Sequence, residues 1–257
     1  MVDIKLEGKG ILITGASRGL GAYAAKHFSE QGARLFLTAR SVTQLEEVKR
    51  SCKNSMLNTY IFGADLTLNT IQHMVNDAKR FLKNIDVVLH CAGGGLGYKD
   101  NLLSQVELMK LHTLNLGIAA EINRLVAPDM IKRRSGNLVH VGSIASSEGV
   151  GSVGYNVTKA ALAAYVRSLG RELNKHNVIC TGILPGGFIS PGNSIARMKD
   201  KDESGYNDFI IERLPRGIMG IPEELIPMLT LLCSSDASMM GGCLVPIDAG
   251  EGKSYIG

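Results

Sequence analysis

Short apolar runs alternate with longer helical segments along most of the chain. Continuous apolar runs of this length are typical of buried parallel strands, which are covered on both faces. They predict strands at 9–14, 33–38, 58–62, 85–90, 137–142, 178–184 and 242–247. Helices are expected from the first glycine-rich turn to about 31, then at 42–53, 67–80, 102–133, 155–174 and 222–233, with Pro128 kinking or interrupting the fourth.

The alternation of strand and helix predicts a Rossmann-type α/β fold, a doubly wound parallel sheet of about seven strands flanked by helices. In such sheets the ligand lies at the carboxyl ends of the strands. Gly15, Gly93, Ser143 and Pro185 are therefore expected at one edge. The segment 186–220 breaks the alternation and is rich in glycine, proline and charge, which favours a substrate-binding loop.

The composition is that of an ordinary globular protein. With 45% hydrophobic and 20% charged residues, and no repeat or linker, residues 1–257 are expected to form a single domain. The net charge of +4 is scattered apart from 132–134, so no nucleic-acid partner is expected. No apolar stretch of about 18 residues predicts a membrane span. The five cysteines form no CxxC pair, which disfavours a disulfide scaffold or a metal site and favours free thiols in the cytoplasm.

A glycine-rich turn joins the first predicted strand to the first predicted helix. It reads Thr14-Gly15-Ala16-Ser17-Arg18-Gly19-Leu20-Gly21. A turn of this kind presents backbone N–H groups and a helix N-terminus, which together favour a bound phosphate group. The glycines allow the tight turn and the close approach of a ligand. The turn is therefore a candidate cofactor site.

Three polar side chains stand at and after the fifth predicted strand. Ser143 ends the strand, Tyr155 follows, and Lys159 comes four residues after the tyrosine. On a helix this i, i+4 spacing places Tyr155 and Lys159 on one face, where the ammonium can act on the phenol. Lowering the pKa of a tyrosine from ~10 to about 7 costs about 4 kcal/mol, which one charge at ~4 Å and an effective dielectric of ~20 supplies.

Together these features resemble the classical short-chain dehydrogenase/reductase family over essentially the whole chain. The matching motifs, in order, are TGxxxGxG at 14–21, Asp65-Leu66, a variant of NNAG at 90–93, Asn115, Ser143, YxxxK at 155–159 and Pro185-Gly186. The first motif alone could belong to any glycine-rich turn, whereas the ordered set is specific. The resemblance implies an enzyme that transfers hydride between a nicotinamide cofactor and a carbonyl or alcohol substrate.

The resemblance also implies a role for each matching residue. Tyr155 would donate a proton to the substrate oxygen, Ser143 would hydrogen-bond that oxygen, and Lys159 would lower the pKa of the phenol while binding the nicotinamide ribose. Asn115 would hold a water molecule in the proton relay. The cofactor would contact Gly15, Ser17, Arg18, Gly19, Leu20, Gly21, Arg40, Asp65, Leu66, Ala92, Gly93, Tyr155, Lys159, Pro185, Gly186, Phe188 and Ser190. Singly, each residue has a structural alternative, such as a helix N-cap for Asp65.

The choice of cofactor is expected to depend on the end of the second strand. A carboxylate there binds the ribose 2′-hydroxyl of NAD, whereas basic residues bind the 2′-phosphate of NADP. The chain has Arg40 at this point and Arg18 in the glycine-rich turn. Two guanidinium groups suit a phosphate, so NADP(H) is expected and NAD(H) is less favoured.

The clearest departure from the family pattern is His90-Cys91, where two asparagines are usual. Those asparagines steady the sheet, so the local hydrogen bonds must be remade while catalysis is not put in doubt. His90 is expected to be a hydrogen-bonded histidine at a strand end rather than a substrate ligand. Cys91 is expected to be a small buried hydrophobe rather than a reactive thiol.

Several related functions fit the resemblance. Besides a general carbonyl reductase or alcohol dehydrogenase, a 3-oxoacyl-carrier-protein reductase is possible, and its acidic carrier would need a basic patch such as Arg124 with 132–134. A sugar-modifying dehydrogenase or reductase is a further option. The glycine spacing disfavours an extended-branch epimerase, and the intact catalytic set disfavours a non-catalytic scaffold. The substrate, which is expected to contact 94–99, 144–150 and 186–220, and the direction of the reaction stay open.

The expected partners are a small carbonyl or alcohol and further copies of the chain. Family members pack the helices that correspond to 102–133 and 152–174 into dimers and tetramers. The resemblance therefore implies a homotetramer or a dimer.

Overall fold

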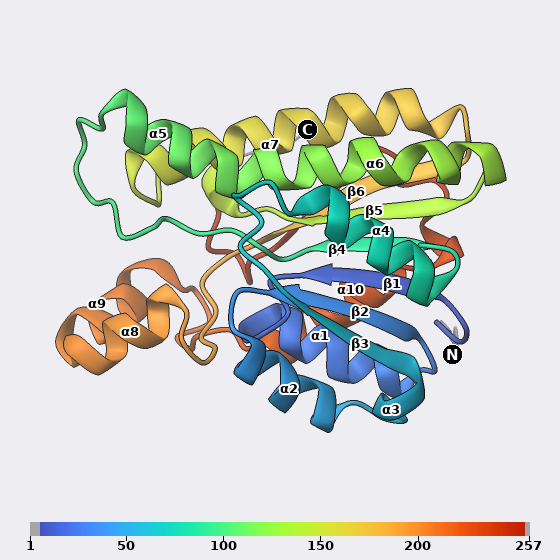
Figure 1. Ribbon diagram of the computed structural model, residues 1–257. Helices are drawn as coiled ribbons and strands as arrows, with labels where there is room; N and C mark the ends of the chain where they lie inside the picture. Colours follow the sequence, from blue (N-terminus) through green and yellow to red (C-terminus); the bar gives the residue numbers. More distant parts are fainter. Residues whose placement is uncertain (1–5, 255–257) are drawn as a thin grey trace.

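The computed structural model describes residues 6–254 and contains one sheet of seven parallel strands (Figure 1). The strands are β1 (Gly10–Thr14), β2 (Arg34–Ala39), β3 (Thr59–Gly63), β4 (Val87–His90), β5 (Gly136–Val141), β6 (Val178–Pro185) and β7 (Leu244–Ile247). Their spatial order is β3-β2-β1-β4-β5-β6-β7, and every pairing is parallel. The predicted Rossmann-type sheet is confirmed.

Helices cover both faces of this sheet (Figure 1). One layer holds α1 (Gly19–Glu30), α2 (Val42–Ser51) and α10 (Ile226–Leu232), and the other holds α4 (Ile71–Leu82), α6 (Ile118–Arg133) and α7 (Val153–Asn174). Successive strand residues serve opposite layers: Ile11 and Ile13 pack in the first, and Leu12 packs in the second. Because both layers are apolar, β1 and β6 are buried along their full length, which explains the continuous apolar runs.

The predicted helix at 102–133 is not one α-helix. It consists of α5 (Gln105–His112), a π-helical turn (Thr113–Gly117) and α6. The expected interruption at Pro128 is wrong, because α6 continues through it. Pro128 is exposed, and so is Arg124, the residue whose carbonyl loses its helical partner at the proline.

Two further segments differ from the prediction. The helix expected at 67–80 begins only at Ile71, because Asp65 Oδ1 accepts hydrogen bonds from the backbone and hydroxyl of Thr67 and forms a turn first. The segment 186–220 contains two helices, α8 (Ser194–Lys201) and α9 (Glu203–Arg213). Asn193 and Asp202 cap them, because each side chain accepts a hydrogen bond from the backbone N–H of the third residue of its helix.

The remaining boundaries shift by a few residues. A short helical turn, α3 (Ser55–Asn58), follows α2, and 3₁₀ turns occupy Ile144–Ser146, Pro222–Glu224 and Ser235–Ala237. The strand order reverses between β1 and β4, since β2 and β3 lie on one side of β1 while β4 to β7 extend on the other. In doubly wound sheets such a reversal opens a crevice at the carboxyl edge, where the ends of β1, β4, β5 and β6 meet.

Candidate active site

The glycine-rich turn after β1 leads directly into α1. Gly15 and Gly19 adopt left-handed φ values of 65° and 57°, which favour glycine. A Cβ on Gly15 would lie 2.8 Å from the backbone nitrogen of Ala92, and one on Gly21 would lie 2.6 Å from the carbonyl oxygen of Gly15. The residue preceding α1, Arg18, makes no side-chain cap, and the first turn of α1 has no acidic residue. The N-terminal N–H groups of α1 thus suit an anion.

Two buried hydroxyls beside this turn have no hydrogen-bond partner among residues 6–254. They are Thr38 Oγ1 at the end of β2 and Ser190 Oγ in the segment after β6. The Ser190 hydroxyl lies 3.2 Å from the position that a Cβ on Gly19 would occupy, so it faces the glycine-rich turn. Buried polar groups normally have partners. The two orphaned hydroxyls and the uncapped helix end fit a polar, phosphate-bearing cofactor.

The two arginines predicted to favour NADP are both exposed. Arg18 lies beside Gly192, where a Cβ would come within 2.9 Å of the guanidinium. Arg40 follows β2, and its charge helps to lower the pKa of Asp65, after the larger effect of the hydrogen bonds from Thr67. Arg40 and Asp65 therefore stand on the same side of the crevice.

Ser143, Tyr155 and Lys159 meet at the carboxyl end of β5. The Lys159 ammonium is buried, lies 5.6 Å from the centre of the Tyr155 ring and donates a 2.9 Å hydrogen bond to the Val141 carbonyl. The Ser143 hydroxyl accepts a 3.1 Å hydrogen bond from the backbone of Ala145 at the start of a 3₁₀ turn. Because this bond uses only a lone pair, the Ser143 proton can be donated to a neighbouring oxygen, either the Tyr155 hydroxyl or a bound substrate.

Burial shifts the two titratable groups toward their neutral forms. Desolvation raises the pKa of Tyr155, and a hydrogen bond with Ser143 opposes that change. Desolvation also lowers the pKa of Lys159 to about 8. The expectation that Lys159 lowers the pKa of the phenol stays a prediction: in the structure the ammonium donates to the Val141 carbonyl and lies 5.6 Å from the centre of the Tyr155 ring.

Asn115 occupies the π-helical turn and is buried. Its Nδ2 donates to the carbonyls of Leu111 and Gly94 at 2.9 and 3.0 Å, and its Oδ1 accepts from the backbone of Gly94 at 2.9 Å. A Cβ on Gly93 would lie 2.9 Å from Asn115 Oδ1 and 3.5 Å from Lys159 Nζ. Asn115 thus joins the turn after β4 to the π-helical turn. Gly93 lies between Asn115 and the Lys159 ammonium.

His90 is held in a buried polar network behind this turn. Its Nε2 donates to Asn123 Oδ1 at 2.8 Å, Asn123 Nδ2 donates to His140 Nε2 at 3.1 Å, and His140 Nδ1 donates to the carbonyl of Thr181 at 3.1 Å. The two imidazole rings stack with centres 4.6 Å apart, and Asn123 also contacts Tyr165. Each of these hydrogen bonds is consistent with two neutral histidines.

The prediction for His90 is confirmed at one ring nitrogen, whereas its Nδ1 has no partner among the described residues. Burial lowers the pKa of His90 to about 4 and places that of His140 well below its usual value. Burial also raises the pKa of Cys91 to about 12, so this thiol is protonated, as expected of a hydrophobe rather than a nucleophile.

The other predicted contact residues lie along the same edge. Leu66 is buried, and the backbone of Ala92 donates to Thr14 Oγ1 at 3.2 Å. The amide of Gly186 donates to Ile247, which fixes the end of β6 beside β7. Phe188 forms a β-bridge with Gly220, and its carbonyl accepts from Asn193 at 2.8 Å. The bridge closes the base of the α8–α9 segment.

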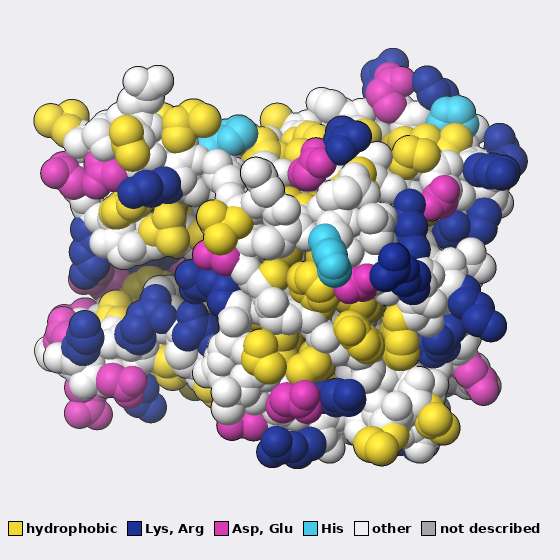
Figure 2. All heavy atoms as spheres, in the orientation of Figure 1, with side chains coloured by type: hydrophobic (Ala, Val, Ile, Leu, Met, Phe, Trp, Pro, Cys, Tyr) yellow, Lys and Arg dark blue, Asp and Glu magenta, His cyan; other side chains and the backbone are white. Residues whose placement is uncertain are grey.

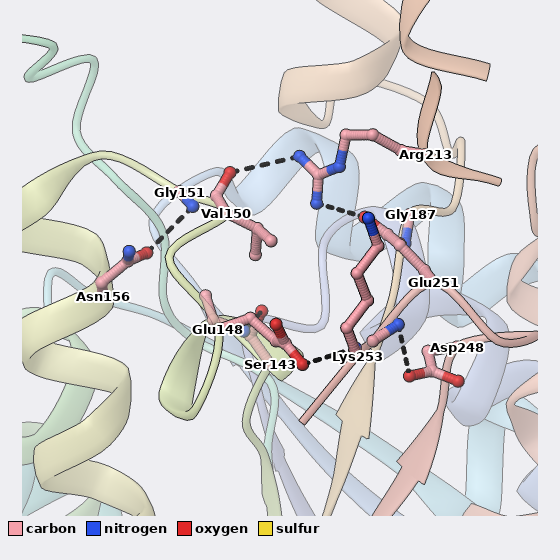
Figure 3. Close-up of polar contacts among 12 residues, drawn as sticks. Ser143, Glu148, Val150, Gly151, Asn156, Gly187, Arg213, Asp248, Glu251 and Lys253 are labelled. Atoms are coloured by element: carbon pink, nitrogen blue, oxygen red, sulfur yellow. Dashed lines mark hydrogen bonds and ion pairs between the residues drawn. The ribbon is translucent and has the colours of Figure 1, made fainter. Parts of the chain in front are cut away.

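Three charged side chains near Ser143 were not singled out in the sequence. Glu148, Arg213 and Glu251 come from the loop after β5, from α9 and from the segment after β7, and their hydrogen bonds join these parts of the chain (Figure 3). No local motif connects them, because they are brought together only by the fold. Figure 2 shows the surface hollowed between α8–α9 and the region of α5, on the side where these segments lie.

Of the basic residues considered for a carrier-protein patch, the triplet 132–134 lies away from Ser143. Arg133 binds the Ile85 carbonyl just before β4, and Arg134 is held by Lys175 and Asn177 just before β6. The triplet 132–134 therefore lies at the amino edge of the sheet, opposite to Ser143. Within residues 6–254, no group of three His, Cys, Asp or Glu side chains is placed to hold a metal ion. No helix in that range is both long and apolar enough to cross a membrane.

The fold and the Ser143–Tyr155–Lys159 cluster agree with a family match. Residues 9–200 match the family described as short chain dehydrogenase. The chain therefore belongs to the short-chain dehydrogenase family, which consists of oxidoreductases that bind a nicotinamide cofactor and act on small molecules. The predicted family is confirmed.

Relatives within the family span nearly the whole chain. A 3-oxoacyl-(acyl-carrier-protein) reductase of Aquifex aeolicus is 28% identical over 256 residues, which cover 97% of this chain and 99% of the relative. A tropinone reductase homolog of Arabidopsis thaliana is 29% identical and covers 97% of this chain and 96% of the relative. The structure of L-sorbose reductase from Gluconobacter frateurii, complexed with NADPH and L-sorbose, matches with a TM-score of 0.91 at 27% identity, over 99% of this chain and 100% of that chain.

Proposed function

We propose that this protein is an NADP(H)-dependent oxidoreductase that transfers hydride between the nicotinamide and a carbonyl or alcohol substrate. The observation that carries the proposal is the cluster of Ser143, Tyr155 and Lys159 beside the crevice, where a serine hydroxyl can donate its proton and an ammonium lies 5.6 Å from the centre of a phenol ring. A carbonyl oxygen placed there would meet a hydrogen-bond donor and a proton donor together.

A bound nicotinamide would supply the hydride, and the side chains of the site would donate and restore the proton. Ser143 donates a hydrogen bond to the substrate oxygen, and Tyr155 transfers its phenolic proton to that oxygen as the carbonyl becomes an alcohol. The Lys159 charge would stabilise the resulting phenolate, and a water molecule bound near Asn115 would restore its proton. Because burial raises the pKa of Tyr155, the phenol is protonated at neutral pH. Tyr155 is thus in the protonated form that a reduction requires, and reduction is the direction we favour.

The cofactor preference rests on charge. The glycine-rich turn and the N-terminus of α1 would bind the pyrophosphate, and Arg18 with Arg40 would bind the 2′-phosphate of NADP. Asp65 and Leu66 would contact the adenine. Ala92 and Gly93, then Pro185, Gly186, Phe188 and Ser190, would line the nicotinamide half. The NADPH in the L-sorbose reductase structure supports this choice.

The substrate is a small carbonyl compound that enters between the loop after β5 and α8–α9. The names of two relatives state different substrates, a 3-oxoacyl carrier-protein conjugate and L-sorbose, and a third relative is named as a homolog of tropinone reductase. A 3-oxoacyl-carrier-protein is the alternative substrate. Its docking would need a basic patch other than 132–134, since that triplet lies at the opposite edge.

We also propose that the chain is a single domain that works as a homo-oligomer in the cytoplasm. Large apolar side chains are exposed on α5 and at the start of α7: Val106 is 63% exposed, Met109 55% and Val157 49%. Figure 2 shows hydrophobic side chains gathered over the α5 region. Such a patch favours burial against a second copy. The five thiols of the structure suit a reducing compartment.

A carbonyl panel tests the proposed function. The purified protein would be mixed with NADPH or NADH and with β-keto thioesters, tropinone-like ketones and ketoses, and cofactor absorbance would be followed. The expected result is oxidation of NADPH with at least one class and a lower kcat/KM with NADH. Failure to bind or oxidise NADPH with every class would contradict the proposal.

A further inference from the structure

Glu251 is a buried carboxylate in the segment that follows β7. Its side chain is only 2% exposed, although glutamate is rarely buried without partners. The carboxylate accepts a hydrogen bond from the backbone N–H of Gly187 and forms an ion pair with Arg213 of α9 (Figure 3). Both oxygens of Glu251 are therefore engaged, each by a different segment of the chain.

Arg213 extends the connection to the loop that follows Ser143. Its second guanidinium nitrogen donates to the Val150 carbonyl at 3.2 Å, and the guanidinium lies 4.5 Å from the centre of the Phe209 ring. The planar fork of arginine suits two such partners at once. Arg213 and Glu251 thus connect three walls of the crevice: α9, the loop at 147–151 and the backbone at 186–188.

The segment that carries Glu251 is itself held in place. Asp248 accepts from the backbone of Gly250 and Gly252 at 3.0 and 3.1 Å, and Glu148 accepts from the backbone of Lys253 at 2.6 Å. A Cβ on Gly186 would lie 2.7 Å from the Glu251 carboxylate. The glycine therefore admits the carboxylate against the backbone directly after Pro185.

We propose that Glu251 is a positioning residue, which holds the backbone after Pro185–Gly186 in register with α9 and with the loop that follows Ser143. The inference rests on the proposed function for its kinetic consequence, because the substrate would bind between these walls. It predicts that the charge pair, rather than the bulk of the side chain, keeps the three segments together. Glu251→Gln keeps the size and one acceptor oxygen and removes the charge.

Hydrogen–deuterium exchange without cofactor tests the connection directly. In Glu251→Gln, exchange should rise together at 147–151, 186–189 and 203–213 by about tenfold or more, while the control Glu223→Gln, at an exposed glutamate, should match the wild type. A rise confined to 248–254, or no rise at all, overturns the proposal. Should Glu251→Gln not fold, Arg213→Gln tests the part of the connection that passes through α9: exchange should rise at 147–151 and 203–213 but not at 186–189, because the bond between Glu251 and Gly187 stays in place.

Kinetics then separate positioning from simple support of the fold. With NADPH and a carbonyl substrate, Glu251→Gln should raise the substrate KM about tenfold and change the Kd of NADPH less than threefold. Arg213→Gln should act alike, and the double variant should be no worse than the worse single variant, since both remove one interaction. A structural role alone would lower the active fraction and leave KM unchanged, which overturns positioning. If the wild type does not oxidise NADPH, the proposed function is contradicted instead. Hydrogen–deuterium exchange still tests whether Glu251 connects the three segments.

Discussion

Tyr155 and Lys159 lie in surroundings that favour the neutral form of each. Desolvation raises the pKa of the phenol and lowers that of the ammonium to about 8. At neutral pH the phenol therefore keeps its proton, while most of the Lys159 population is still charged. Under the proposed function a reduction needs both states at once, because the proton would leave from Tyr155 and Lys159 would stabilise the resulting phenolate.

The pH dependence of reduction follows from Lys159. We expect kcat/KM for the NADPH-dependent reaction to be level up to about pH 7, to be roughly halved near pH 8 and to fall further at higher pH, as the ammonium of pKa about 8 loses its proton. Initial rates across pH 6.5 to 10 at fixed ionic strength, on the order of ten pH values, would define the profile. A profile that stays level to pH 10 would contradict the role given to Lys159.

Arg40 is expected to set the preference between cofactors. A charge-assisted hydrogen bond to a phosphate contributes about 1.5–3 kcal/mol, so Arg40→Ala should lower kcat/KM with NADPH by at least tenfold. The value with NADH should change little, because NADH lacks the 2′-phosphate. Arg50→Ala, at an exposed arginine of α2, is the matched control. An unchanged ratio of NADPH to NADH activity would remove Arg40 from the site.

Among the elements, β4, β5 and α6 are joined by side chains as well as by packing. His90, Asn123 and His140 come from these three elements, and all are buried. The network replaces the asparagines that are usual after the fourth strand. It lies behind the turn that carries Gly93, to which Asn115 is hydrogen-bonded, and it contains two histidines that must stay neutral.

The stability of the fold should therefore depend on pH. His90 has a folded pKa of about 4, below the unfolded value of about 6.5, so the unfolded chain binds more protons in between. The contribution is fully present above pH 6.5 and is lost as the pH falls toward 4, which amounts to roughly 3 kcal/mol. Denaturant unfolding of His90→Asn should show a shallower fall in the free energy of unfolding over this range than the wild type. The exposed His73→Asn should follow the wild type, and a His90→Asn curve that does the same would refute the assignment.

The elements also show what the sequence could predict. The strands could be predicted from apolar runs in the sequence. A sheet that is covered on both faces has strands that are apolar at every position, as β1 and β6 show. The π-helical turn could not be predicted in this way, because it depends on hydrogen bonds from Asn115 to Leu111 and to Gly94, which is distant in the sequence. The contacts of Glu251 were equally hidden, since Gly187 and Arg213 are far from it in the chain. Local sequence patterns therefore predicted the sheet and the motif residues. The π-helical turn and the contacts of Glu251 depend on hydrogen bonds between distant parts of the chain, which local patterns do not reveal.

For the molecule as a whole, the exposed apolar side chains of α5 and α7 are the clearest sign of assembly. Native mass spectrometry at micromolar concentration should give a dimer or a tetramer. Val106→Glu combined with Val157→Glu should shift the mass toward the monomer, because charges would be buried without partners. The exposed Val42→Glu, on α2, serves as the control, since Val42 is 51% exposed on another layer. A wild-type monomer would contradict the proposed assembly.

The central claim is that one phenol supplies the proton for hydride transfer at the end of β5. Tyr155→Phe removes that hydroxyl and leaves the ring and the glycine-rich turn, so NADPH should bind with a Kd within about threefold of the wild type while kcat falls by about 10²–10⁴-fold. Tyr60→Phe, at a half-exposed tyrosine of β3, should keep full activity. The most direct measurement is kcat for the reduction of the best carbonyl substrate by Tyr155→Phe with NADPH shown to be bound. A kcat within tenfold of the wild type would contradict the account.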